Sequence, residues 1–395
     1  MKCICLLLSF LSFQTIFSQT KLPVIKASSR SVTINDDGFV DKGGWNLAPK
    51  IRPDIYTADR TRKTKWVIFY TDIDSIKVKL KPGATFDFIV LLNGKDSCYT
   101  QIASAIPPAE KNPSTKNDTI PFTLTSYNVI SVKAVINDRD TLQLHFDASS
   151  SNCRLTKEAI LKKTSLLAAQ PGVAAGTANP DYNKLAKVFK LQLGNTIFTD
   201  PVVAATGITA QEMDGRFGWN MFEGRQVEID YDHYLLIVHN IPVQRAKGYT
   251  KVPLHFIRSF PCVPGSFIIS GKKYSSDFML DTGSSTAIIL DSSWAAEQNF
   301  PDSLPLIKTS VLRDPRGNQY KTRLVRFPQF SISDHSLSAV PTLILGSKNP
   351  ADFKINFFGN DLLKRFNIIL DFKNDLMYLK PNGLMNTTYR DAVAG

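Results

Sequence analysis

The sequence predicts a mainly β protein, because most of its apolar residues fall in short alternating runs. Ser75–Leu80 and Thr141–His145 alternate polar and apolar residues, the period expected of half-buried strands. The 22 prolines and 21 glycines that interrupt such runs favour short strands joined by turns. Helical patterns are few, and they predict short helices in four segments: Thr156–Leu167, Tyr182–Lys187, Ser292–Gln298 and Gly359–Phe366.

The amino-terminal residues have the pattern of a secretory signal. Lys2 precedes an apolar run that ends at Phe17, and Ser18-Gln19 follows, so residues 1–18 are predicted to be a cleavable signal peptide. We therefore expect a secreted, periplasmic or cell-surface protein. No later stretch approaches the roughly 20 apolar residues of a membrane span, so none is expected.

Charge, cysteine and histidine patterns point away from nucleic acid, metals and cofactors. The net charge of +12 is spread along the chain without basic blocks, unlike the footprint of nucleic-acid-binding proteins. Beyond the signal, Cys98, Cys153 and Cys262 have no metal-type spacing and fit either one disulfide with one thiol or three thiols. The histidines lack metal-type pairing and are expected at surface or strand positions: His145, His233, His239, His255 and His335.

Two polar segments, Ile106–Thr119 and Asn240–Lys251, read as linkers. They separate a front segment, residues 19–106, from two longer segments, residues 120–239 and 252–382. The front segment contains strand-like runs and an Asn93-Gly94 turn, which is typical of a β-hairpin. We expect it to be a β-sandwich-like accessory domain, with a propeptide-like module as the alternative.

The two longer segments repeat one pattern. Ile120–Leu124 (IPFTL) opens the first and Val252–Phe256 (VPLHF) the second; they lie 27 residues before Asp147 and 29 before Asp281. Each aspartate ends an apolar strand-like run and is followed by small polar residues.

A second motif recurs in the same order. The Phe-Gly pairs ending at Gly218 and Gly359 each precede an aspartate by 12 residues, Asp230 and Asp371 respectively. We interpret this as a duplication. Two similar halves packed about a pseudo-twofold axis would bury each other's apolar faces and bring Asp147 and Asp281 together.

The second half resembles a known family. Phe278–Ser285 (FMLDTGSS) is similar to the active-site segment of pepsin-like and retropepsin-like aspartic peptidases, Phe357–Leu363 (FFGNDLL) to their apolar-apolar-glycine turn, and Leu370–Leu379 to their closing hairpin. The similarity is of the kind seen in retropepsin-like proteins encoded by Bacteroidota. It covers residues 120–382 and implies a bilobal, pepsin-like double barrel, with residues 120–239 as the first lobe and 252–382 as the second.

The resemblance implies the chemistry of an aspartic endopeptidase. Two carboxylates share a proton and activate one water against a peptide bond; Asp147 and Asp281 would supply them. It also implies that Thr282 hydrogen-bonds across the lobes and that Gly283 lets backbone N–H groups approach the carboxylates. The serines three places after each aspartate, Ser150 and Ser284, would brace their outer oxygens. The expected partner is a polypeptide substrate, and no cofactor or metal is implied.

The first half departs from the family pattern. Ala148 has no hydroxyl for a cross-lobe bond, and Ser149 stands where the family has glycine. A degenerate peptidase-like protein that binds peptide or a cell-surface partner is therefore the alternative function. In a further alternative, Asp147 is an ordinary turn residue and two copies of residues 252–382 complete the site as a homodimer instead of a monomer.

Two further interpretations concern the surroundings of the site. Asp230 and Asp371 are expected to be turn residues in closing hairpins. A covering flap is expected at Gln170–Thr177 or Arg313–Tyr320, on the basis of composition.

Overall fold

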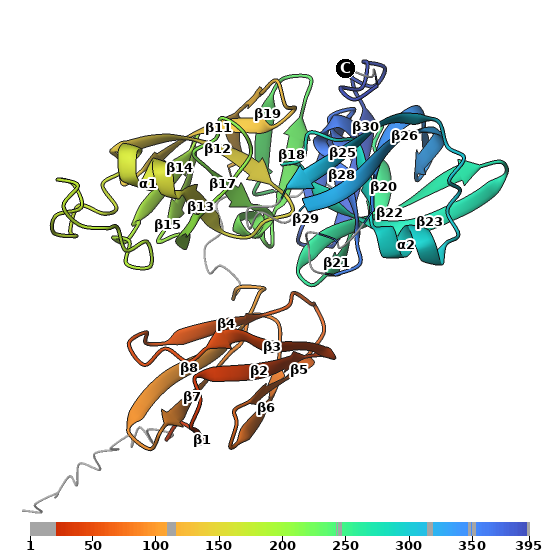
Figure 1. The fold of residues 1–395 in the computed structure, drawn as a ribbon. Coiled ribbons are helices and arrows are strands. Elements are labelled where there is room, and N and C mark those ends of the chain that lie inside the picture. The colour runs from red at the N-terminus through yellow and green to blue at the C-terminus, as the bar shows by residue number, and fades with distance from the viewer. Residues whose placement is uncertain are drawn as a thin grey trace, which may run out of the picture. The chain divides into compact units, whose positions relative to one another are not determined.

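The computed structural model describes residues 21–108, 116–241, 243, 247–313, 319–346, 349 and 353–392. The predicted signal peptide, residues 1–18, and the tip of the expected flap at Arg313–Tyr320 lie outside these residues. The chain divides into two compact units, residues 1–108 and 109–395, and it is mainly β (Figure 1).

The first unit contains two four-stranded sheets, ordered β1-β7-β8-β4 and β3-β2-β5-β6. Alternate residues of both sheets, such as Ile34 in one and Phe88 in the other, are buried in one shared core. The strands are β1 (Val24–Ala27), β2 (Ser31–Asp36), β3 (Phe39–Asn46), β4 (Asp54–Ala58), β5 (Lys65–Tyr70), β6 (Ser75–Leu80), β7 (Thr85–Leu92) and β8 (Asp96–Ser104).

The second unit contains two lobes joined by a six-stranded sheet, ordered β20-β30-β29-β18-β19-β9. Its strands are β9 (Asp118–Pro121), β18 (Gln226–Asp230), β19 (Leu235–His239), β20 (Thr250–Pro253), β29 (Phe366–Asp371) and β30 (Leu376–Pro381). Each half contributes three strands, and β18 of the first pairs with β29 of the second from Gln226–Asp371 to Ile229–Ile368. The closing hairpins of the two halves therefore pair with each other across the lobe boundary.

The first lobe, residues 118–239, carries an eight-stranded sheet. Its strands are β10 (Thr123–Leu124), β11 (Ile130–Ile136), β12 (Asp140–Asp147), β13 (Cys153–Thr156), β14 (Lys190–Leu193), β15 (Thr196–Thr199), β16 (Val203–Thr206) and β17 (Gly215–Gly218). Thr156 is the N-cap of helix α1 (Lys157–Lys163), and its hydroxyl accepts from the Ala159 N–H. The segment η1 (Trp219–Phe222) is a 3₁₀ helix.

The second lobe, residues 250–381, carries the corresponding eight-stranded sheet. Its strands are β21 (His255–Ile257), β22 (Phe260–Ile269), β23 (Lys272–Asp281), β24 (Ile288–Leu290), β25 (Leu306–Arg313), β26 (Gln319–Ile332), β27 (His335–Leu345) and β28 (Asn356–Gly359), with helices α2 (Ser292–Glu297) and α3 (Asn360–Leu363). The corresponding elements of the two lobes pair in the same way: β12 lies parallel to β17, as β23 does to β28.

Two barrels were expected, one in each lobe. Only the second lobe forms a closed barrel. In the second lobe β26 is 14 residues long and pairs with both β27 and β22, which closes six strands into a barrel. In the first lobe the strands β14 and β16 have four residues each, and among the described residues no pairing closes the sheet. The first lobe is therefore a half-barrel.

Two smaller expectations are settled by the fold. The helix expected at Tyr182–Lys187 is wrong, because the side-chain amide of Gln170 donates to the carbonyls of Asp181 and Lys184 and accepts from the Asp181 N–H, which holds the segment in a turn. All three cysteines of the described chain are buried and unpaired, and burial raises the pKa of Cys153 and Cys262 to about 12.

No helix of the described residues is long and apolar enough to span a membrane.

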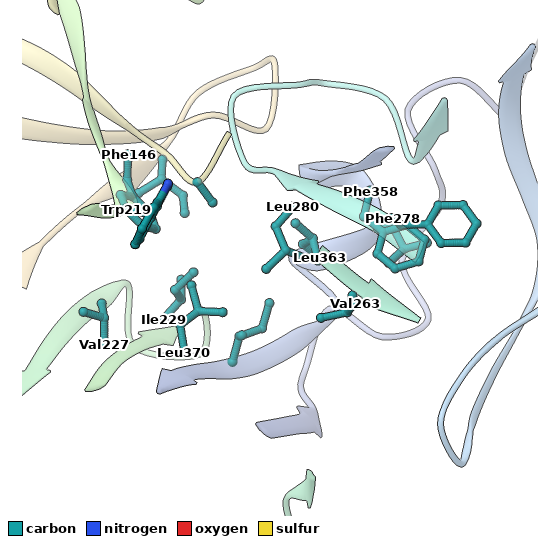
Figure 2. Close-up of a cluster of buried hydrophobic side chains, with 14 of the residues drawn as sticks. Phe146, Trp219, Val227, Ile229, Val263, Phe278, Leu280, Phe358, Leu363 and Leu370 are labelled. Carbon is teal, nitrogen blue, oxygen red and sulfur yellow. The ribbon is translucent and has the colours of Figure 1, made fainter. Parts of the chain in front are cut away.

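One hydrophobic core runs through both lobes. Figure 2 shows Phe146 and Trp219 of the first lobe, Leu280 and Phe358 of the second, and Leu370 of the joining sheet gathered in it. The ends of β12 and β23 are thereby anchored in packed apolar residues.

Candidate active site

The two aspartates occupy equivalent turns at the ends of β12 and β23. Asp147 lies in register with Gly218 of β17, and Asp281 with Gly359 of β28. In both turns the N–H three residues on returns to the carbonyl of the aspartate, at 3.1 Å from Ser150 and 3.2 Å from Ser284. Both acids therefore enter their turns through the same main-chain hydrogen bond, although the turns differ further on: the Gly218 N–H donates to the carbonyl of Asn152, five residues after Asp147, and the Gly359 N–H to that of Ala287, six residues after Asp281.

Each turn packs against a glycine that admits no side chain. A Cβ at Gly218 would lie 2.2 Å from the carbonyl oxygen of Ser150, and one at Gly359 would lie 2.2 Å from that of Thr286. These contacts explain why the Phe-Gly motif recurs: the glycine lets the strand pass directly beneath the turn that presents the acid.

Thr282 joins the two turns. Its buried hydroxyl donates to the Phe146 carbonyl at 2.7 Å and accepts from the Ala148 N–H at 2.9 Å. Both partners belong to the main chain of the first lobe. Ala148 offers no hydroxyl for the reverse pair of bonds, so within the described part of the chain the main-chain junction of the two turns depends on the Thr282 hydroxyl.

Ser149 connects the two carboxylates. Its N–H and hydroxyl both donate to Asp147 Oδ1, at 2.9 and 2.7 Å, and its hydroxyl oxygen is 3.4 Å from Asp281 Oδ1. The two acids therefore face one another across a single hydroxyl within one chain, and no second copy is needed to bring them together. The sequence interpretation treated this serine only as a departure from glycine.

Gly283 of the second motif packs against side chains at the end of β12. A Cβ added there would meet Asp147 Cγ at 3.4 Å and His145 Cε1 at 3.0 Å. The glycine of the second motif thus packs directly against the carboxyl group of the first.

The two serines expected to brace the carboxylates have other partners among the described residues. The Ser150 hydroxyl accepts from Arg216 Nε at 3.0 Å, and the Ser284 hydroxyl bonds with that of Thr286 at 2.8 Å. In the first lobe, Ser149 and not Ser150 hydrogen-bonds with the Asp147 carboxylate.

Two residues lie beside the dyad without a prediction that placed them there: Arg216, and His145, which the sequence assigns only to a surface or strand position. Arg216 Nε lies 3.6 Å from Asp147 Oδ2. His145 is buried, and its Nε2 is 2.8 Å from the Thr209 hydroxyl. The alternation of side chains along a strand could have placed His145 here, because it lies two residues before Asp147 and therefore on the same side of β12.

The electrostatic environment favours one proton on the pair. Burial, followed by the negative charge of Asp147, raises the pKa of Asp281 to about 7, against the opposing effects of the Gly283 N–H, the Ser149 hydroxyl and Arg216. Two neighbouring carboxylates do not both ionise easily, and the ion pair with Arg216 stabilises the charge on Asp147.

Burial also controls His145. It lowers the pKa of His145 to about 4; the Asp147 carboxylate opposes this shift, and the positive charge of Arg216 adds to it. Above that pH the ring is neutral, so the histidine contributes hydrogen-bonding capacity and no charge.

The remaining site expectations concern turns and metals. Asp230 and Asp371 each accept backbone N–H groups two and three residues further on, which is the geometry of hairpin turns. The expected flap segment Gln170–Thr177 forms consecutive turns. Across the described residues, no three acidic, histidine or cysteine side chains are grouped as metal ligands would be.

Comparison with known proteins gives a limited result. No known family matches the sequence, and no curated protein matches it. Among solved structures, the chain is similar to the crystal structure of an aspartic proteinase from Irpex lacteus, with 12% identity and a TM-score of 0.45. The alignment covers 70% of this chain and 100% of the Irpex lacteus chain.

Proposed function

We propose that this chain is an exported aspartic endopeptidase in which Asp147 and Asp281 activate a water against a peptide bond. One observation carries the proposal: both carboxylates lie within hydrogen-bonding reach of one hydroxyl, that of Ser149. Two carboxylates directed at one position are what the two-acid mechanism requires. The proposed location follows from the signal-like residues 1–18.

In the proposed reaction the pair enters with one proton. The ionised member accepts a proton from the attacking water as the other donates its proton to the amide. The burial of Asp281 and the ion pair of Arg216 with Asp147 favour placing the shared proton on Asp281. Loss of the shared proton as pH rises through about 7 would stop catalysis.

The test is peptide hydrolysis between pH 3 and 7 by the mature chain and by Asp147→Asn and Asp281→Asn, with and without a statine-type inhibitor. We expect each substitution to lower the rate by about 10²–10⁴. Asp230→Asn is the matched control, because the Asp230 carboxylate accepts from the N–H groups of Asp232 and His233 in a hairpin turn. Equal rates in the parent and the two dyad variants would refute the proposal.

One observation favours a second function, peptide binding without hydrolysis. The Ser149 hydroxyl already occupies the position between the acids at which a catalytic water would be held. A chain that keeps this hydroxyl in place would bind substrate and leave it intact.

The double variant Ala148→Thr/Ser149→Gly separates the two functions, because it restores the family motif in the first lobe. A weakened enzyme should gain hydrolysis, whereas a pure binding protein should bind the peptide and remain inactive. Ala148→Val/Ser149→Ala is the control, since it removes the serine hydroxyl without restoring the threonine hydroxyl or the glycine.

A further inference from the structure

Three neighbouring strands of the first lobe place His145 and two arginines in a row beside Asp147. His145 of β12 is in register with Arg216 of β17, and Arg216 is in register with Arg154 of β13. Residues in register on adjacent strands project from the same face of a sheet. Asp147 lies two residues after His145 and therefore shares this face.

The opposite face of these strands belongs to the core. Phe146, Phe217 and Leu155 alternate with the row and are fully buried. Arg154 and Arg216 are partly exposed, and they belong to the face of the sheet that carries the acid.

Two members of the row are held in place. His145 bonds with the Thr209 hydroxyl, and Arg216 donates to the carbonyl of Ile208 as well as to Ser150. The segment around residues 208–209 thus fixes both side chains against the sheet.

Arg154 differs from its neighbours because its charge is not compensated. Among the described residues its guanidinium has no hydrogen bond and no ion pair, and its pKa is lowered by burial and then by the adjacent Arg216. Arg216 already has the carboxylate of Asp147. A half-buried cation beside a second cation is a favourable place for an anionic group.

The same positions in the second lobe are apolar. Met279 of β23 is in register with Phe357 of β28, which is in register with Ile289 of β24. Phe260 and Phe353 pack on the same cluster, with stacked rings 5.8 Å apart. The two acids therefore have a row with two arginines on one side and an apolar row on the other.

We infer that the site prefers peptides with an acidic side chain on one side of the bond over the dyad and an apolar side chain on the other. The inference rests on the proposed function for the identity of the ligand as a peptide. Arg154, with Arg216 beside it, is the specificity-determining residue, because guanidinium groups bind carboxylates through charge-assisted hydrogen bonds.

Binding of uncleaved peptides tests this preference without requiring turnover. The probes are hexapeptides with a central statine and otherwise apolar residues, carrying Glu or Gln immediately before or immediately after it. Calorimetric titration at pH 5 keeps the glutamate ionised. At one of the two positions we expect the Glu peptide to bind about tenfold or more tightly than its Gln partner.

Substitutions at Arg154 identify the source of the preference. Arg154→Gln should remove most of the Glu-over-Gln difference, and Arg154→Lys should retain part of it. Arg139→Gln is the control, since Arg139 is an exposed residue of the β11–β12 turn and should leave the preference unchanged. Equal affinities for Glu and Gln peptides, absence of binding by all of them, or a preference that survives Arg154→Gln would overturn the inference.

Hydrolysis distinguishes failure of this inference from failure of the proposed function. Bonds cleaved in a peptide library, located by mass spectrometry, should have Asp or Glu on one side and an apolar residue on the other. Cleavage without that preference refutes the inference and leaves the peptidase intact. Binding with the preference but without cleavage refutes the peptidase and supports the inference.

Discussion

The turn that presents Asp147 and the turn that presents Asp281 share two main-chain features and have different surroundings. Both return an N–H to the aspartate carbonyl, and both lie over a glycine with no room for a Cβ. Around them, the first lobe places His145 and Arg216 where the second places Met279 and Phe357.

The comparison separates what the turn needs from what the chemistry uses. Glycines and main-chain hydrogen bonds set the position of each acid, and they are equivalent in the two lobes. The flanking side chains are free to differ, so a symmetric frame carries an asymmetric site in which Asp147 has an ion pair and Asp281 has a raised pKa.

The largest effect should come from filling the space beneath either turn. Gly218→Ala and Gly359→Ala each place a methyl group 2.2 Å from a carbonyl oxygen, and we expect each to lose about 3 kcal/mol or more of unfolding free energy. Urea denaturation measures the loss. Gly207→Ala, where nothing lies within 4 Å, should be nearly neutral. If only one of the two variants lost stability, the two glycines would not have equivalent roles.

Thr282 should come next, because its hydroxyl makes two hydrogen bonds to the main chain of the opposite lobe. Thr282→Val leaves the Ala148 N–H and the Phe146 carbonyl without their partner, for an expected loss of about 2–4 kcal/mol. Thr282→Ser keeps the hydroxyl and should recover most of the stability. If Val and Ser variants unfold at the same urea concentration, the hydroxyl does not join the lobes.

The raised pKa of Asp281 predicts a pH-dependent stability. The folded pKa of about 7 exceeds the unfolded value of about 3.9, so the folded state binds more protons in between, and this group's contribution to stability falls as pH rises through that window. Asp281→Asn should raise the melting temperature at pH 8 relative to the parent, by about 2–4 °C per kcal/mol relieved, and the difference should shrink toward pH 4. A difference independent of pH would contradict the assignment. The depressed pKa of His145 acts in both proteins and largely cancels in the comparison.

The smallest effect tests whether the first lobe can regain the missing half of the junction. Ala148→Thr supplies a hydroxyl facing the main chain of the second motif, and a gain of about 0.5–1.5 kcal/mol is expected relative to Ala148→Val, which has the same shape. Equal stability of the Thr and Val variants would show that the second lobe has no complementary partners.

Much of the frame was predictable because it depends on local pattern. Period-two alternation located the strands, and the repeated Phe-Gly pairs located the two glycines that lie opposite Asp147 and Asp281. The half-barrel was not predictable, because closure of the sheet depends on one long strand, β26, pairing with two partners.

The details of the site depended on contacts between distant segments. Ser149 connects the acids only because the second lobe brings Asp281 to it, and His145 is buried only where Gly283 and Thr209 meet it. Tyr182–Lys187 shows the same limit, since the side chain of Gln170 overrides its local helical pattern.

The contacts of Thr282 have a consequence for how the first motif can vary. Since its hydroxyl meets only main-chain atoms of the opposite lobe, it places no demand on which side chain stands at position 148. Position 148 can therefore vary without removing either hydrogen bond of Thr282, and alignment of the two acids is a property of the second motif more than of the first.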